Sequence, residues 1–268
     1  MTLANRSLPL AALAASLTLA APQISAQAFD AVRLYGATPG GDGGTLGAAV
    51  ISTRQYPGSD ESRTVIYPLL DYQWKSGWFA GTTNGIGINL SKRQDLDYGL
   101  RLTADLGRAQ SRSSALNGMG DIDAKLEFGG FFNYAINPQT VLTSSLRYGS
   151  GNNSRGLLID VGAAYAYPLA PQWRLGLGVA ATFANAEYLQ SYFGVNATQS
   201  LASGYAAYTP GTGLRDVRAN LSLTYQLNPS TAITTAVSFS SLQGDAQDSP
   251  LTRQRNSAIG ILAVSYGF

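Results

Sequence analysis

Apolar and polar residues alternate with a period of two along several segments, and 216–227 shows the pattern most clearly. Successive side chains of a strand point to opposite faces, so this segment presents one apolar and one polar face. The apolar face holds Val217, Ala219, Leu221, Leu223, Tyr225 and Leu227, and the polar face holds Asp216, Arg218, Asn220, Ser222, Thr224 and Gln226. The same split predicts strands over 97–107 and over 122–136, where Ile122 and Ala124 begin the apolar face. An apolar face suits lipid, and a polar face that carries charges suits a wet interior.

The last eleven residues, 258–268, form a strand without any charge, and its apolar face ends in Tyr266 and Phe268. In a soluble protein such a strand would invite edge pairing, whereas a closed barrel has no free edge. Phe268 also resembles the C-terminal signature by which outer-membrane barrels are recognised for assembly. We therefore predict an all-β fold, an antiparallel transmembrane β-barrel, in preference to an ordinary all-β domain.

The connections between the predicted strands are of two kinds. Short turns that contain proline lie at 137–139, 169–171 and 228–230, and longer polar loops lie at 110–120, 149–155, 185–213 and 243–255. In outer-membrane barrels the short turns are periplasmic and the long loops external. Successive strands of such a barrel alternate in direction, and Phe268 is expected at the periplasmic end. Counting the strands back from Phe268 therefore requires two short strands within 77–91, with a break near Asn84 and Gly85. This gives twelve strands that begin near Thr45, with ten or fourteen as alternatives.

The N-terminus has the pattern of a secretory signal peptide, with Arg6, an apolar stretch from Leu8 to Ala21, and small residues after it. Cleavage is predicted after Ala26, with Ala28 as the alternative. An uncleaved anchor is disfavoured because the stretch is short, and no later run approaches the ~18 apolar residues of a spanning helix. The predicted organisation is a signal peptide at 1–26, a flexible lead-in at 27–43 and a barrel at 44–268 in the outer membrane of a Gram-negative type of cell.

The composition removes most catalytic chemistry, because the chain has neither His nor Cys. A Ser-His-Asp triad, a Cys-His pair, a thiolate or His metal site and a disulfide are thereby excluded. Two carboxylate pairs remain, Asp121 with Asp123 and Asp245 with Asp248, which could share a proton or bind calcium. Hydrogen bonding in loops is the interpretation we favour, so no catalytic, cofactor or metal residue is predicted. The net charge of +2 gives no general reason to bind nucleic acid.

The charges predicted to face the barrel interior are of both signs. A ring of one sign would indicate selective conduction, whereas mixed signs favour ion pairs that hold neighbouring strands together. We therefore expect a packed lumen, with an open lumen as the alternative. The residues are Arg101, Asp105, Lys125, Glu127, Arg147, Asp160, Arg174, Asp216 and Arg218.

Five loop segments, in order along the mature chain, resemble the MltA-interacting protein family, the MipA/OmpV outer-membrane proteins. The most specific is the Gln-Ser-Tyr-Phe-Gly-Val stretch at 190–195, and Arg54 departs from the family pattern, where Pro is usual. The segments are 55–60, 120–124, 188–195, 213–217 and 244–250.

The resemblance implies a scaffold rather than a catalyst. The member that names the family is thought to bridge a lytic transglycosylase and a bifunctional murein synthase, and the family has no catalytic residues to carry over. We expect a monomeric structural or scaffolding protein of the peptidoglycan synthesis and hydrolysis machinery, embedded in outer-membrane lipid. A small-solute porin-like channel and a surface adhesion protein are the alternatives.

The loop 185–213 carries an apolar and aromatic cluster that needs a surface to cover it. It either folds over the mouth of the barrel as a lid or meets a partner. Because the loop is external on this topology and a murein partner would be periplasmic, the lid is the favoured interpretation. The cluster consists of Tyr188, Leu189, Tyr192, Phe193, Val195, Tyr205 and Tyr208.

Overall fold

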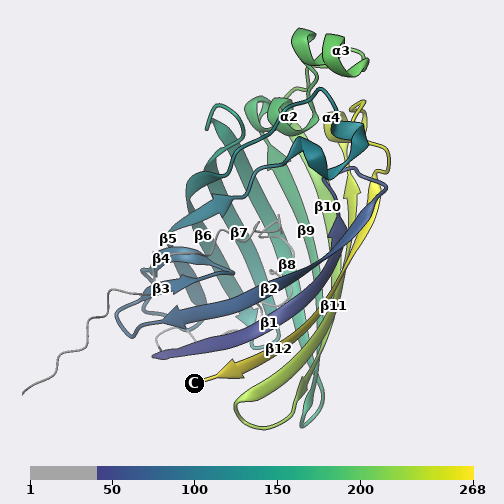
Figure 1. Cartoon of the computed structure of the whole chain (residues 1–268). Helices are drawn as coiled ribbons and strands as arrows, with labels where there is room; N and C mark the ends of the chain where they lie inside the picture. The colour runs from purple at the N-terminus through teal and green to yellow at the C-terminus, as the bar shows by residue number, and fades with distance from the viewer. Residues whose placement is uncertain (1–40) are drawn as a thin grey trace, which may run out of the picture.

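The computed structural model describes residues 41–268, so the predicted signal peptide (1–26) and residues 27–40 of the predicted lead-in lie outside the described residues. The described chain is a closed barrel in which consecutive strands pair antiparallel and the first strand pairs with the last (Figure 1). The strands are β1 (Gly43–Arg54), β2 (Ser62–Gln73), β3 (Trp78–Gly81), β4 (Gly85–Asn89), β5 (Leu96–Asp105), β6 (Lys125–Asn137), β7 (Thr140–Ser150), β8 (Gly156–Ala170), β9 (Trp173–Ala184), β10 (Gly213–Gln226), β11 (Thr231–Leu242) and β12 (Asn256–Gly267).

The predicted count of twelve strands is confirmed, and so is the division of 77–91 into two short strands, β3 and β4. The turn between them ends at Gly85, whose φ is 75°. Glycine is favoured there because a side chain is strained at positive φ. A Cβ at this position would also collide with the carbonyl oxygen of Leu102 on β5.

The barrel closes where β1 meets β12, and the terminal residue takes part in the closure. The Gly44 amide donates to the Phe268 carbonyl at 2.9 Å, and the Phe268 amide donates to the Gly44 carbonyl at 3.0 Å. The Phe268 ring lies 6.1 Å from the ring of Tyr72, between centroids. A Cβ on Gly44 would approach the Phe268 ring to 2.7 Å, so the absence of a side chain makes room for this ring.

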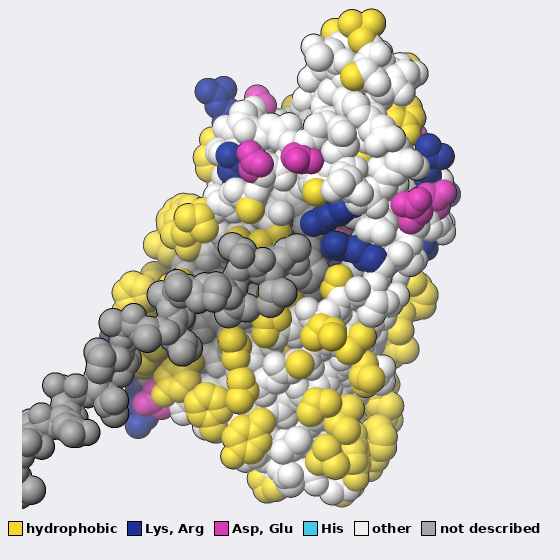
Figure 2. Space-filling model, viewed as in Figure 1, with side chains coloured by type: hydrophobic (Ala, Val, Ile, Leu, Met, Phe, Trp, Pro, Cys, Tyr) yellow, Lys and Arg dark blue, Asp and Glu magenta, His cyan; other side chains and the backbone are white. Residues whose placement is uncertain are grey.

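The outward faces carry the apolar side chains that the alternation predicts for lipid, and Figure 2 shows many of them on the wall of the barrel. Leu221 is 45% exposed and Phe128 is 56% exposed, although both are large and apolar. One prediction was wrong. The strand predicted at 122–136 begins only at Lys125, and Ile122 is buried beneath the external loops instead of facing lipid. The backbone of Ile122 pairs with Arg108 in an isolated bridge, which turns its side chain inward.

The two ends of the barrel differ as the connection lengths predict. Short turns at 138–139, 171–172 and 227–230 lie at one end, together with the end of β12. The long connections gather at the other end and carry the helices (Figure 1), and they span 55–61, 106–124, 151–155, 185–212 and 243–255. The helices are the 3-10 turns η2 (Gln110–Arg112) and η3 (Ser114–Leu116) and the α-helices α2 (Ala186–Phe193), α3 (Ala197–Ser203) and α4 (Gly244–Gln247). Between residues 41 and 268, no helix is long and apolar enough to cross a membrane.

The short β3–β4 hairpin leaves part of the wall without a paired strand. β2 pairs with β3 only through Asp71–Gln73, and β5 pairs with β4 only through Gly99–Leu102. Both backbone groups of Leu70 bond to Thr82 of the hairpin turn, so the edge of β2 that carries them faces away from β1. The direction of the backbone groups repeats every two residues, so the nitrogen of Pro68, which carries no hydrogen, points to the same side as that of Leu70. A proline on this edge removes no ladder hydrogen bond, as expected for the edge of a strand.

Removal of Phe268 should impair folding of the barrel, because it deletes the last reciprocal backbone pair of the β1–β12 seam and the contact with Tyr72. We expect a smaller fraction of the detergent-solubilised protein to show the heat-dependent shift in electrophoretic mobility of a folded barrel. Tyr72→Leu removes the ring contacts of Tyr72 and its hydrogen bond to Asp42 but leaves the backbone pair of Gly44 and Phe268 intact, so it should have a much smaller effect. Equal folding of the truncated and full-length proteins would contradict the role assigned to this residue.

Candidate functional site

A network of buried ion pairs runs along the inner wall of the lumen from β6 to β10. Arg147 on β7 contacts Glu127 on β6 at 3.3 Å and Asp160 on β8 at 3.1 Å. Arg218 on β10 contacts Asp160 at 3.3 Å and Asp216 at 2.5 Å. The side chain of Glu127 is 1% exposed and that of Arg218 is 4% exposed, so the charges are almost fully withdrawn from water. Each buried charge therefore depends on its partners for stabilisation.

Hydroxyl groups extend the network to β5 and also join it to β9, which lies between β8 and β10. Thr103 of β5 donates to Glu127 at 3.1 Å, and Thr182 of β9 donates to Asp160 at 2.6 Å. Arg218 also donates to the Thr182 hydroxyl at 2.7 Å. A continuous band of hydrogen-bonded polar side chains thus runs along the inner wall from β5 to β10.

The prediction of a lumen laced with ion pairs of mixed sign is confirmed for the central charges. Arg101 is also buried and donates to the Ser145 hydroxyl at 2.7 Å. Asp105 and Lys125 are half-buried near the outer end, and Arg174 is exposed and lines the lumen nearer the inner end.

Arg215 was not predicted to face the interior, because the alternation of 216–227 assigns odd positions to lipid. A bulge between Leu214 and Asp216 of β10 inserts one extra residue against β9, so that Arg215 and Asp216 both point inward. The Arg215 guanidinium donates to Asp216 at 2.5 Å and to the Tyr188 hydroxyl at 2.9 Å. The bulge therefore connects the ion-pair network to the external loop.

The external loops form a lid with its own apolar core, which agrees with the lid interpretation of loop 185–213. Leu189 is 1% exposed and Phe193 is 0% exposed, and both pack in one cluster with Leu158 of β8, Leu242 of β11 and Ala246 of α4. Val195 packs in a second cluster with Met119 and Leu251, against which Tyr205 and Tyr208 lie partly buried. Loops that are far apart in the sequence thus cover the mouth of the barrel together.

Polar contacts fasten the lid to the barrel. The Tyr192 hydroxyl lies 2.6 and 2.7 Å from the two carboxylate oxygens of Asp105, at the end of β5. Burial raises the pKa of Tyr192, and it raises the pKa of Tyr188, which stacks on Tyr192, to about 12. Both hydroxyls therefore stay protonated, and able to donate, at neutral pH.

Four arginines lie close to the lid, two of them in the loop between β5 and β6, one at the end of β1 and one in β2. Arg108 is 1% exposed and donates to the Tyr192 carbonyl at 3.0 Å. Burial, together with the nearby charge of Arg63, lowers the pKa of Arg112 to about 10. Arg54, the departure from the family pattern, donates to the Asp60 carbonyl at 2.8 Å and to the Ser62 hydroxyl at 3.2 Å, and so holds the 55–61 loop closed.

The two predicted carboxylate pairs lie in the external loops and take part in loop hydrogen bonds. Asp121 and Asp123 are both exposed, and Asp121 accepts from the Gln110 amide at 2.6 Å. Asp245 accepts from the Gly211 amide at 2.6 Å, and Asp248 lies 3.3 Å from the Gln247 side-chain amide. No group of three or more His, Cys, Asp or Glu residues in 41–268 could hold a metal ion.

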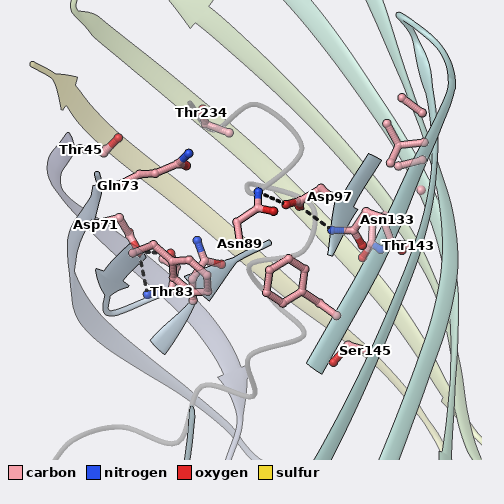
Figure 3. A pocket seen from close by; sticks show the side chains of 18 of the residues that line it. Thr45, Asp71, Gln73, Thr83, Asn89, Asp97, Asn133, Thr143, Ser145 and Thr234 are labelled. Atoms are coloured by element: carbon pink, nitrogen blue, oxygen red, sulfur yellow. Dashed lines mark hydrogen bonds between the residues drawn. The ribbon is translucent and has the colours of Figure 1, made fainter. Parts of the chain in front are cut away.

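Two cavities lie on opposite sides of the ion-pair network. The outer cavity, of about 130 Å³, lies beneath the lid and is lined by Glu127, Arg147, Asp216, Arg218 and Tyr188, among others. The inner chamber, of about 490 Å³ (Figure 3), is lined by Gln94 and Gln226 toward the short turns and by Asp160 toward the outer end. A small outer cavity therefore lies on the lid side of the network, and a larger chamber lies toward the end that carries the short turns.

A comparison with protein-family models matches residues 46–268 to the family described as MltA-interacting protein MipA. No curated protein sequence matches the chain.

Among solved structures, the chain is similar to the NanC porin, with 10% identity, a TM-score of 0.48, and coverage of 83% of this chain and 98% of that one. It is similar to the KdgM porin, with 8% identity, a TM-score of 0.44 and coverage of 84% and 99%. It is also similar to the CymD monoaromatic hydrocarbon channel, with 12% identity, a TM-score of 0.42 and coverage of 92% and 94%.

Asp160→Ala should destabilise the barrel strongly, because it leaves Arg147 and Arg218 close together in a buried site with one carboxylate fewer. We expect a loss of about 3–5 kcal/mol in the free energy of unfolding, measured by urea titration in detergent micelles. Asp95→Ala is the matched control, because it breaks an Arg–Asp pair whose side chains are 64% and 41% exposed. The control should lose less than about 1 kcal/mol. Equal losses in the two variants would contradict the importance assigned to the buried network.

Proposed function

Because the chain belongs to the MltA-interacting protein MipA family, whose model matches residues 46–268, we propose that this outer-membrane barrel is a non-catalytic scaffold of the cell envelope. Its partners in this proposal are a lytic transglycosylase and a murein synthase, which it holds together at the periplasmic face of the outer membrane. The family name refers to one such interaction.

The observation that carries the proposal is the closure of the lumen on the outer side only. Buried ion pairs and the lid lie in the outer half, whereas the inner chamber of about 490 Å³ lies toward the short turns, which the predicted topology assigns to the periplasm. A lumen that opens only toward the short turns suits partners on that side. The exposed carboxylates Asp121 and Asp123, in contrast, lie in the external loops, away from any periplasmic substrate.

The periplasmic turns are the surface available for such partners. Asn137 and Asn228 are exposed, and in the turns 138–139 and 227–230 these asparagine side chains accept hydrogen bonds from backbone amides. Such turns keep their shape without a partner, so a partner meets a preformed surface. The barrel wall fixes the positions of the turns relative to one another.

Site-specific photocrosslinking in intact cells tests the direction of the interactions. A crosslinking amino acid at Gln139, Gln172 or Ser230, in the three short turns, should capture the transglycosylase and the synthase, identified by mass spectrometry. The same amino acid at Leu201, which is 90% exposed on α3 of the lid, is the matched control and should capture neither. Capture of these enzymes from Leu201 alone, or from no position, would contradict the scaffold proposal.

A small-solute channel is the second candidate function, and the polar inner chamber is the observation that favours it. Its difficulty is the outer end of the barrel, where the lid covers the mouth. We expect planar-bilayer recordings of the purified barrel to show little or no steady conductance. Large stable steps whose ion selectivity changes in Arg218→Ala would favour the channel, whereas steps that are the same in Arg174→Ala and Arg218→Ala would point to a contaminant.

A further inference from the structure

The inner chamber is lined by residues of all twelve strands, and its lining combines many amide and hydroxyl side chains with small and apolar residues. Figure 3 shows Thr45, Gln73, Asn89, Asn133 and Thr143 around one space, although they come from different strands. The volume of about 490 Å³ is that of a site for a small molecule. Structural stability does not require so many amide and hydroxyl groups on one cavity wall, since apolar side chains could fill it instead.

Three amide side chains that line the chamber contain buried atoms without a hydrogen-bond partner in the part of the chain that the structure describes. These atoms are Nε2 of Gln73, Oδ1 of Asn84 and Oδ1 of Asn220. Buried polar atoms are nearly always satisfied, and each exception calls for a missing partner such as a ligand or water. The three include one donor and two acceptors, so the partner must both accept and donate hydrogen bonds.

Other polar groups of the chamber are already held in place. The Asp97 carboxylate accepts from the side-chain amide of Asn89 at 2.5 Å and from that of Asn133 at 2.9 Å. Asp71 accepts from the Thr83 hydroxyl at 2.5 Å and from its backbone amide at 3.3 Å. Figure 3 shows both groups on the chamber wall. Side chains fixed in this way lose little conformational entropy when a ligand binds.

The charges and the aromatic rings of the chamber narrow the class of ligand. Asp71, Asp95 and Asp97 line it near the inner end and outnumber Arg174, which lines the same chamber, so the net negative charge disfavours phosphates and other anions. Phe79 and Phe131 pack edge to face, with ring centroids 5.8 Å apart, and supply apolar surface on the same wall. A neutral ligand with many hydroxyl or amide groups and an apolar face satisfies all of these features. The pyranose ring of a sugar has this character.

We propose that the inner chamber is a binding site for a neutral oligosaccharide that enters from the periplasm. The amides of Gln73, Asn84 and Asn220 bond to its hydroxyl or N-acetyl groups, the Asp97 group orients it, and the ring faces of the sugar pack near Phe79 and Phe131. This site is separate from the turns to which the scaffold function is assigned. It does not require a protein partner.

Isothermal titration calorimetry of the mature protein in detergent micelles tests the site, with tri-N-acetylchitotriose as the neutral probe and trigalacturonate as an anionic trisaccharide. We expect the neutral sugar to bind and the anionic sugar to bind at least about tenfold more weakly. Asn220→Ala should weaken binding about 3- to 10-fold, the effect of one neutral hydrogen bond. Asn117→Ala, at an exposed asparagine of the lid, is the matched control and should leave the affinity unchanged.

Gln73→Ala provides a second chamber variant in case Asn220→Ala fails to fold, and the heat-dependent mobility shift checks folding in each case. The absence of any binding of the neutral sugar would overturn the proposal, as would binding that is equal in wild type, Asn220→Ala and Gln73→Ala. Because this assay contains no partner protein, its failure leaves the crosslinking result for the scaffold untouched, and the reverse also holds.

Discussion

Backbone hydrogen bonding inside a membrane is the constraint on which the rest of this structure depends. Hydrocarbon offers no partner for an N–H or C=O group, so a sheet that crosses it must close on itself. Here the closure is completed by the pairing of β1 with β12, ending at Gly44 and Phe268. The short β3–β4 hairpin joins β2 to β5 with the fewest paired residues, and Pro68 occurs on the edge that this leaves.

Closure also decides what becomes of the inward side chains. In an open sheet they would face solvent, but in a barrel they face one another across a limited space, and buried charges must find partners there. Arg147, Asp160 and Arg218 do so on three different strands, and Thr182 completes the group. The network is thus a consequence of placing charges of both signs on lumen-facing positions at similar depth.

The network divides the barrel into two parts with different properties. The outer part is filled by the lid, which Tyr192 ties to Asp105 and which Tyr188 ties to Arg215. The inner part is an open polar chamber whose amide groups are incompletely satisfied. Both proposals, the scaffold function and the oligosaccharide site, therefore use the end of the barrel opposite the lid.

The sequence by itself determined the strands, the barrel class and most of the charged residues that face the lumen. Alternation and turn composition are local properties, and the geometry of a strand places alternate residues on opposite faces. The need for an even number of strands also predicted the division of 77–91 into two strands. Tertiary structure alone decided the inward position of Arg215, which depends on a bulge against β9, and the burial of Ile122, which depends on a bridge to Arg108. The chamber and its unsatisfied amides likewise arise from the register of distant strands, and no local pattern in one strand specifies what faces it across a lumen.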